Sequence, residues 1–430
     1  MAKTHTVKSG DTLGKISVRY YGYFSKWTEI VQANPQLSGR KTAADGSPLI
    51  FPGDVLIIPE KERSAQSLSA GAEPSKTVVL DEDAKQDMSL VIDGKKFTGF
   101  TGYTLVQSVK GVDAFSFSAP YDSSKEDLKK AFAPFVYHDC KVFYDGDMVF
   151  NGVVLAPAVS LSPSSSTLNV QGYAKCGVLI DSCLPESLFP AEYNGLNLKQ
   201  IAETVCAPFG VNVVVDGDVG EVFKKVEIDV GGKIWDFLEK LTEQRGLFLS
   251  NTQDGSLLIY KPKTESVRAS FKQGEFPLIS VTPNFSSQGM YSHITGYSKT
   301  TSESDSAKYT WENAFLTKKG VLRCMGKKID DATEGTLESS VKALAGEMFA
   351  SCVKYSMSVS GHRDKDGRVY RKNMAVSLNA PGAEIYKDTK FLVDEVTLKR
   401  SDNGGLTADF SLVLPESRDG SLPEVFPWEE

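Results

Sequence analysis

The chain has 430 residues, of which 48 are Lys or Arg, 55 are Asp or Glu and 41% are hydrophobic, so its formal net charge is −7. At about 100–200 residues per domain, this length predicts two to four domains that each bury a core. The acidic balance argues against a protein whose main task is to wrap nucleic acid or to lie on anionic lipid.

The cysteine spacing and the hydropathy of the chain indicate which classes of protein are excluded. The cysteines form no C-x-x-C pair and no Cys-His cluster at zinc spacing, so we expect buried, reduced thiols and no metal site. No stretch approaches the roughly 18–20 apolar residues of a membrane span, and a patterned domain begins close to residue 1. We therefore expect a chain that is neither inserted into a membrane nor exported by an N-terminal signal.

Residues 4–60 predict a self-contained β-α-α-β unit. A short first strand is followed by a turn and by apolar residues at helical spacing over 13–20. A second helix ends at Asn34-Pro35, because the residue before proline is pushed out of the α region. A closing strand is expected over residues 55–58.

Residues 61–87 predict a flexible linker. The segment contains no aromatic residue and is rich in Ser, Ala, Lys and acidic side chains. It cannot bury enough apolar area to offset the entropy of ordering. As a coil, it would have a root-mean-square reach on the order of 30 Å.

The remaining chain predicts an α+β fold that is mainly β. Residues 88–175 alternate as strands and contain a hairpin signal at Asp145-Gly146. Residues 176–275 contain two amphipathic helices and a further hairpin, and residues 276–416 return to strands around one helix. Many short antiparallel strands favour two small β-barrels that flank a mixed α/β insertion, with residues 417–430 as a tail.

The sequence contains no recognisable catalytic motif. The chain has four histidines, and none lies in an H-E-x-x-H motif or beside a G-x-S-x-G turn. The trio His138-Asp139-Cys140 places a base next to a nucleophile, but neighbouring strand residues point to opposite faces. Paired acidic residues are too common to single out a glycosidase pair. We expect no catalytic residue, no bound metal and no cofactor.

The N-terminal unit resembles a LysM domain across its whole length. The resemblance rests on residues 6–17 (TVKSGDTLGKIS), 27–35 (WTEIVQANP) and 51–59 (FPGDVLIIP). It implies a shallow groove for glycans that contain N-acetylglucosamine, between the loop after the first strand and the loop after the second helix. Carried over by position, the groove residues are Gly10, Asp11, Thr12, Leu13, Asn34, Pro35 and Gln36. This subtype also occurs in phage tail proteins, so contact with peptidoglycan and docking on a baseplate protein both stay open.

The remaining chain resembles the baseplate hub proteins of contractile phage tails, of the Mu-like and T-even type. The resemblance rests on residues 170–183 (VQGYAKCGVLIDSC), 196–213, 234–260, 367–378 and 391–398 (FLVDEVTL). It implies a trimeric ring with two similar β-barrels per subunit, between a central spike and the tail tube. The family has no catalytic residues to carry over.

Together these observations predict a structural hub that adapts a threefold spike to a sixfold tube in the tail baseplate of a virion. The implied partners are two further copies of the chain, the spike, the tail tube, baseplate wedge proteins and, through LysM, peptidoglycan. DNA would pass through the ring without specific binding. Two alternatives remain: a peptidoglycan hydrolase anchored by LysM, and the hub of a phage-derived injection system such as a bacteriocin or secretion device.

Overall fold

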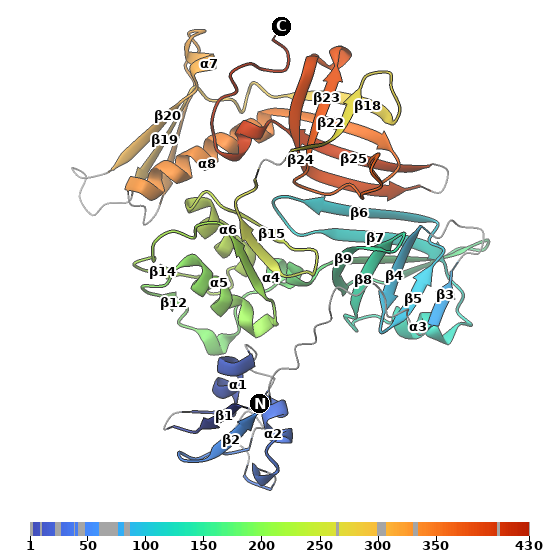
Figure 1. Ribbon diagram of the computed structural model, residues 1–430, viewed down its shortest axis with the longest axis vertical. Coiled ribbons are helices and arrows are strands. Elements are labelled where there is room, and N and C mark those ends of the chain that lie inside the picture. Colours follow the sequence, from blue (N-terminus) through green and yellow to red (C-terminus); the bar gives the residue numbers. More distant parts are fainter. Residues whose placement is uncertain are drawn as a thin grey trace. The chain divides into compact units, whose positions relative to one another are not determined.

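The structure is a computed structural model, and it forms two compact units. One comprises residues 1–74 with the segment 204–211, and the other comprises residues 75–203 with 212–430 (Figure 1). The residues that the structure describes are 3–8, 11–21, 27–37, 39–41, 48–59, 76–80, 87–263, 266–298, 307–329, 334–401 and 405–429.

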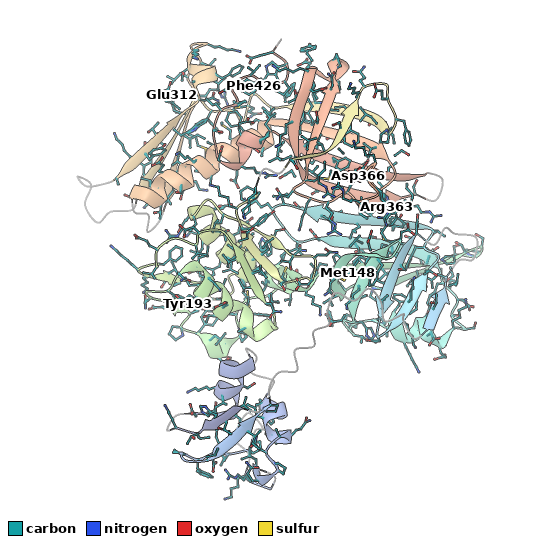
Figure 2. The ribbon with its side chains drawn as sticks, in the orientation of Figure 1. Met148, Tyr193, Glu312, Arg363, Asp366 and Phe426 are labelled. Carbon is teal, nitrogen blue, oxygen red and sulfur yellow. The ribbon has the colours of Figure 1, made fainter. Side chains whose placement is uncertain are left out.

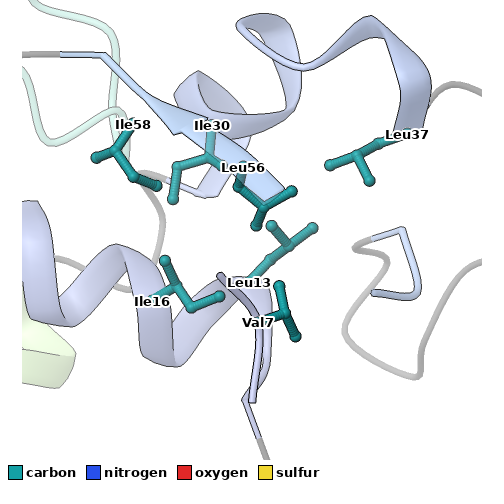
Figure 3. Close-up of a cluster of buried hydrophobic side chains, with 7 residues drawn as sticks. All are labelled: Val7, Leu13, Ile16, Ile30, Leu37, Leu56 and Ile58. Atoms are coloured by element: carbon teal, nitrogen blue, oxygen red, sulfur yellow. The ribbon is translucent and has the colours of Figure 1, made fainter. Parts of the chain in front are cut away.

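The N-terminal unit has the expected β-α-α-β order. Strand β1 (Lys3–Thr6) pairs antiparallel with β2 (Val55–Ile58), and between them lie α1 (Leu13–Tyr21), α2 (Trp27–Gln32) and the 3-10 turn η2 (Pro35–Leu37). The sequence pattern predicts this first strand at Thr6-Val7-Lys8, whereas the observed strand begins at Lys3 and ends at Thr6. The unit has its own apolar core, drawn in Figure 3: Val7, Leu13, Ile16, Ile30, Leu37, Leu56 and Ile58.

The second unit is mainly β, as predicted. Its first β-rich part contains α3 (Glu126–Ala131) and the strands β3 (Lys76–Val79), β4 (Met88–Ile92), β5 (Lys95–Thr98), β6 (Gly102–Ser108), β7 (Ala114–Pro120), β8 (Asp139–Tyr144), β9 (Asp147–Val154), β10 (Ala158–Leu161) and β11 (Ser166–Ala174). The hairpin of β8 and β9 turns at Asp145-Gly146, where both residues adopt positive φ. The predicted turn chemistry is thus the observed one.

The insertion is mixed α/β, again as predicted. It contains η3 (Lys175–Gly177), α4 (Val178–Asp181), η4 (Glu186–Leu188), β12 (Glu192–Tyr193), α5 (Leu198–Cys206), η5 (Ala207–Phe209), β13 (Val213–Asp216), β14 (Val226–Glu227), α6 (Ile234–Gln244), β15 (Phe248–Asn251) and β16 (Leu257–Tyr260). Helix α6 buries Ile234, Leu238 and Leu241, the stripe that helical spacing predicts.

The last part returns to strands. It contains β17 (Val267–Lys272), β18 (Leu278–Phe285), β19 (His293–Ser298), β20 (Lys308–Glu312), α7 (Ala314–Thr317), β21 (Cys324–Ile329), α8 (Glu334–Cys352), β22 (Val353–Ser360), β23 (Ala375–Ala380), η7 (Pro381–Ala383), β24 (Ile385–Arg400), β25 (Leu406–Val413) and η8 (Pro415–Arg418). Strands β19, β20 and β21 form a separate small sheet.

One large sheet joins the two β-rich parts. Its main path runs β18-β22-β25-β24-β6-β7-β11-β9-β8-β4-β5-β3, and the step from β24 to β6 crosses from the last part to the first. Within the described residues this path is open, and no strand pairing there closes either part into a ring. The two expected barrels are therefore two groups of strands in one continuous sheet, which we call the first and the second ladder. Full closure of either group stays a prediction.

The two ladders repeat the same strand order. In the first, β6, β7, β11 and β10 are antiparallel neighbours, and in the second β18, β22, β25 and β24 are. Strands β8 and β9 form a hairpin in the first ladder, as β23 and β24 do in the second. The order of the strands along the chain is also the same in the two ladders. In the first ladder, β9 and β10 together take the place that the long strand β24 has in the second. The second unit, which we call the body, thus contains an internal repeat of its strand arrangement.

The ends of the expected segments differ from the prediction. Residues 76–79, expected in the linker, form β3 and pair parallel with β5, whereas residues 60–75 and 81–86 lie outside the described residues. The expected tail is also packed. The indole Nε1 of Trp311 donates to the carbonyl of Gly420 at 2.9 Å, and Phe426, labelled in Figure 2, stacks on Trp428 with ring centroids 4.6 Å apart. The sequence of residues 417–430 is short and ends in charged residues, so it does not indicate that its aromatic side chains are packed.

Candidate functional site

The candidate glycan groove is built on the core of the N-terminal unit. Leu13 begins α1 and Leu37 ends η2, and both side chains are fully buried in the same cluster (Figure 3). The loop after β1 and the loop after α2 are thereby anchored to one core. Leu13 is consequently a packing residue and offers no side chain to a ligand.

Asn34 is a structural residue. Its side chain is fully buried, and its Nδ2 donates to the carbonyls of Ile30 and Ile57, both at 2.7 Å. Its Oδ1 accepts from the backbone N–H of Ile57 at 2.8 Å and from Nε2 of Gln36 at 2.9 Å. All of its hydrogen-bonding capacity is used within the domain. Asn34 therefore joins the end of α2 to β2 and cannot also bind an acetamido group.

Asp11 and Thr12 shape the first loop. The Oδ2 of Asp11 accepts from the backbone N–H of Lys8 at 2.9 Å and lies 3.0 Å from Nε2 of the buried His5. The exposed Thr12 accepts from the N–H of Lys15 at 3.2 Å through its Oγ1, which caps the start of α1. The Thr12 hydroxyl proton stays available to a ligand. Gly10 lies outside the described residues.

Of the expected groove residues, Thr12, Pro35 and Gln36 are exposed. Sequence reasoning missed a neighbouring surface around Phe51, which is 57% exposed. The guanidinium of Arg40 lies 5.7 Å from the centre of the Phe51 ring and pairs with Asp54 at 2.5 Å. This hydrogen bond lowers the pKa of Asp54. The ion pair holds the start of β2. Residues 42–47 lie outside the described residues.

The structure separates the one candidate catalytic trio. Cys140 is buried, and burial raises the pKa of its thiol to about 12, so it is no thiolate nucleophile. His138 pairs with Asp93 at 2.9 Å, and the exposed Asp139 pairs with Lys175 at 2.8 Å. As the strand alternation predicts, the three side chains do not converge.

The cysteines and the other potential metal ligands of the described residues form no further site. All six cysteines are free, but Cys183 and Cys324 are exposed, contrary to the expectation of buried thiols. Within the described ranges, no three His, Cys, Asp or Glu side chains are grouped as metal ligands would be. None of the described helices combines the length and apolar character that a membrane crossing needs.

The body contains a buried polar junction where its three parts meet. Asp113, which follows β6, pairs with Lys372 at 2.7 Å and accepts from Nδ2 of Asn251 in β15 at 3.0 Å. Burial raises the pKa of Asp113, against the opposing effect of Lys372. A second contact joins the ladders, because Arg363 pairs with Asp147 at 2.7 Å (Figure 2). Ion pairs and hydrogen bonds thus join the three parts of the body to one another.

Comparisons with known proteins agree with this division. Residues 5–59 match the LysM domain, and residues 176–261 match the second domain of Gp44-like baseplate hub proteins. The chain is 22% identical over 348 residues to the baseplate hub protein gp44 of Escherichia phage Mu, which covers 79% of this chain and 89% of that protein.

Two solved structures share the fold of the body. The 43 kDa tail protein of prophage MuSo2 from Shewanella oneidensis superposes with a TM-score of 0.66 at 23% identity, over 77% of this chain and 99% of that one. The tail protein from Neisseria meningitidis MC58 also gives a TM-score of 0.66, at 17% identity, over 78% and 98% of the two chains. The chain thus combines a LysM domain with a body of the Mu-like baseplate hub type, and both resemblances read from the sequence are confirmed.

Proposed function

We propose that the chain is a structural baseplate hub of a contractile phage tail, which forms a homotrimeric ring between a threefold spike and a sixfold tube. The observation that carries the proposal is the internal repeat of the body. Three copies of a chain with two similar ladders present six similar units, so one ring can satisfy threefold and sixfold neighbours together. The kinship with the Mu hub protein supports the same assignment.

The scaffold character of the body supports a non-enzymatic role. Its buried carboxylate Asp113 is paired with the partly exposed Lys372. Three copies would carry a formal charge of −21, three times −7. If part of this charge faces the channel, passing DNA would be repelled and would not stick. The proposed partners are the spike, the tail tube and the baseplate wedge proteins.

The hub proposal is tested by following an affinity-tagged chain during particle production. The tagged chain is expected to co-purify with tail particles and to be labelled by immunogold at the baseplate end. Recovery only as free protein would contradict the proposal. Tails without capsids in the same preparation would indicate an injection device. Clearing of a peptidoglycan zymogram by the purified chain would indicate the anchored hydrolase.

For the LysM unit we propose peptidoglycan contact through Thr12, Pro35 and Gln36. The hydroxyl of Thr12, the amide oxygen of Gln36 and nearby backbone groups offer hydrogen bonds to acetamido groups, and Pro35 offers an apolar contact. The full chain should sediment with insoluble peptidoglycan, and the double variant Thr12→Val, Gln36→Ala should not. Thr4→Ala, on the exposed face of β1, is the matched control. If wild type stays in the supernatant, docking on a baseplate protein becomes the working function of this unit.

A further inference from the structure

The internal repeat makes a specific comparison between two strand edges possible. In the second ladder, residues 395–400 of β24 pair on one side with β25 and on the other with β6 of the first ladder. The repeat places β10 in the position of this segment and β18 in the position of β6. The pairing of β24 with β6 joins the two ladders within one chain. By the repeat, the equivalent pairing is β10 with β18, and these two strands do not pair within one chain.

Strand β10 is an uncovered edge. Among the described strands it pairs only with β11, and all four of its residues are exposed. Val159 lies opposite the buried Leu168 and is 49% exposed, whereas the corresponding Leu398 lies opposite Ala408 and is 1% exposed. Leu398 is buried because it also lies opposite Leu105 of β6. Val159 lacks such a neighbour.

Strand β18 is the matching uncovered edge. Among the described strands it pairs only with β22, and its apolar residue Ile279 is 58% exposed. Phe276, just before it, is 86% exposed. The strand β6, which stands in the same position of the first ladder, pairs with β24, and its Tyr103 and Leu105 are buried. The second ladder thus exposes apolar side chains where the first covers them.

Neither edge carries the charges that normally protect a free strand. Residues 155–174 and 276–298 contain no Asp, Glu, Lys or Arg, in a chain of which 24% is charged. Exposed edges of soluble proteins are commonly guarded by charged side chains or proline, because unpaired N–H and C=O groups invite another strand. Pro283 lies in the later half of β18, and the register with β22 shifts between Leu278 and Ser280, so the regular stretch before the proline is residues 280–282, which can face most of the four residues of β10.

We propose that β10 of one copy pairs antiparallel with β18 of a second copy and so repeats between chains the contact that β24 makes with β6 within a chain. The contact is heterologous, since each chain offers β10 to one neighbour and β18 to the other, and such contacts form a ring when the rotation between neighbours closes. The proposal rests on the ring assembly put forward above. It identifies the strands that hold the ring together.

The test uses the full-length chain and measures its mass in solution by light scattering and native mass spectrometry. Wild type is expected to assemble, while Val159→Lys and Ile279→Lys each remain monomeric, because a lysine on either edge cannot be buried unpaired. An equimolar mixture of the two variants should give one-to-one heterodimers. Each variant keeps one intact edge, so they can pair once and no further.

The control is Leu322→Lys, at a 76% exposed apolar residue outside both edges, which should assemble as wild type does. Circular dichroism melting verifies that every variant folds. If both edge variants assemble as wild type does, or if their mixture gives no heterodimers, the proposed strand pairing is wrong, although the ring itself is not contradicted. A wild-type chain that stays monomeric at all concentrations would contradict the ring as well.

Discussion

Replacing Asn34 by alanine should unfold the LysM unit locally, although the family resemblance places this residue in the glycan groove. The side chain makes four hydrogen bonds, with Ile30, Gln36 and both backbone groups of Ile57. At about 0.5–1.5 kcal/mol each, these bonds sum to about 2–6 kcal/mol. We expect a loss of about 3 kcal/mol, which is a large part of the stability of so small a domain.

Hydrogen–deuterium exchange of the full chain measures this loss in place. The amides of β2 and α2 in Asn34→Ala should exchange on the order of a hundredfold faster, since each 1.4 kcal/mol corresponds to a factor of about ten. Gln36→Ala removes one partly exposed hydrogen bond and serves as the control, with a change of less than about 1 kcal/mol. Binding to peptidoglycan should fall in Asn34→Ala only as far as the folded fraction falls. Normal exchange protection together with lost binding would refute the structural role of Asn34.

Three further predictions concern the body. Lys372→Met should lower the free energy of unfolding by about 3–5 kcal/mol, because it leaves Asp113 buried without its cation, and adding Asp113→Asn should restore part of the loss; equal urea midpoints for wild type and Lys372→Met would contradict this. Burial lowers the pKa of His362 below its usual value, so the unfolded chain takes up a proton that the folded chain does not, and stability should fall as the pH drops below about 6.5. His362→Gln should flatten this dependence in melting curves recorded between pH 5 and pH 8, and an unchanged slope would show that other groups cause it. Gly346→Ala should loosen the C-terminal segment, because the added Cβ would lie 2.3 Å from the carbonyl oxygen of Ser417, and limited proteolysis should then cut near residue 418.

The sequence by itself determined the local elements and the two domain types. The Asp-Gly turn at 145–146, the apolar stripe of α6 and the blocks of the LysM unit are all short-range patterns. They depend on residues a few positions apart, so that propensity, capping and turn chemistry decide them before any tertiary contact forms. For the same reason the alternation over 138–140 was enough to predict that Asp139 lies on the opposite face from His138 and Cys140.

Only the tertiary structure decided how these elements use their side chains. The sequence resemblance places Asn34 in the groove, but its side chain is engaged in hydrogen bonds with Ile57, 23 residues away in the chain. Alternation tells which face a strand residue takes but not which strand lies beside it, so the β24–β6 junction and the free edges of β10 and β18 were invisible in the sequence. Strand neighbours are set by the packing of the whole sheet, and the surfaces open to another copy are those that this packing leaves uncovered.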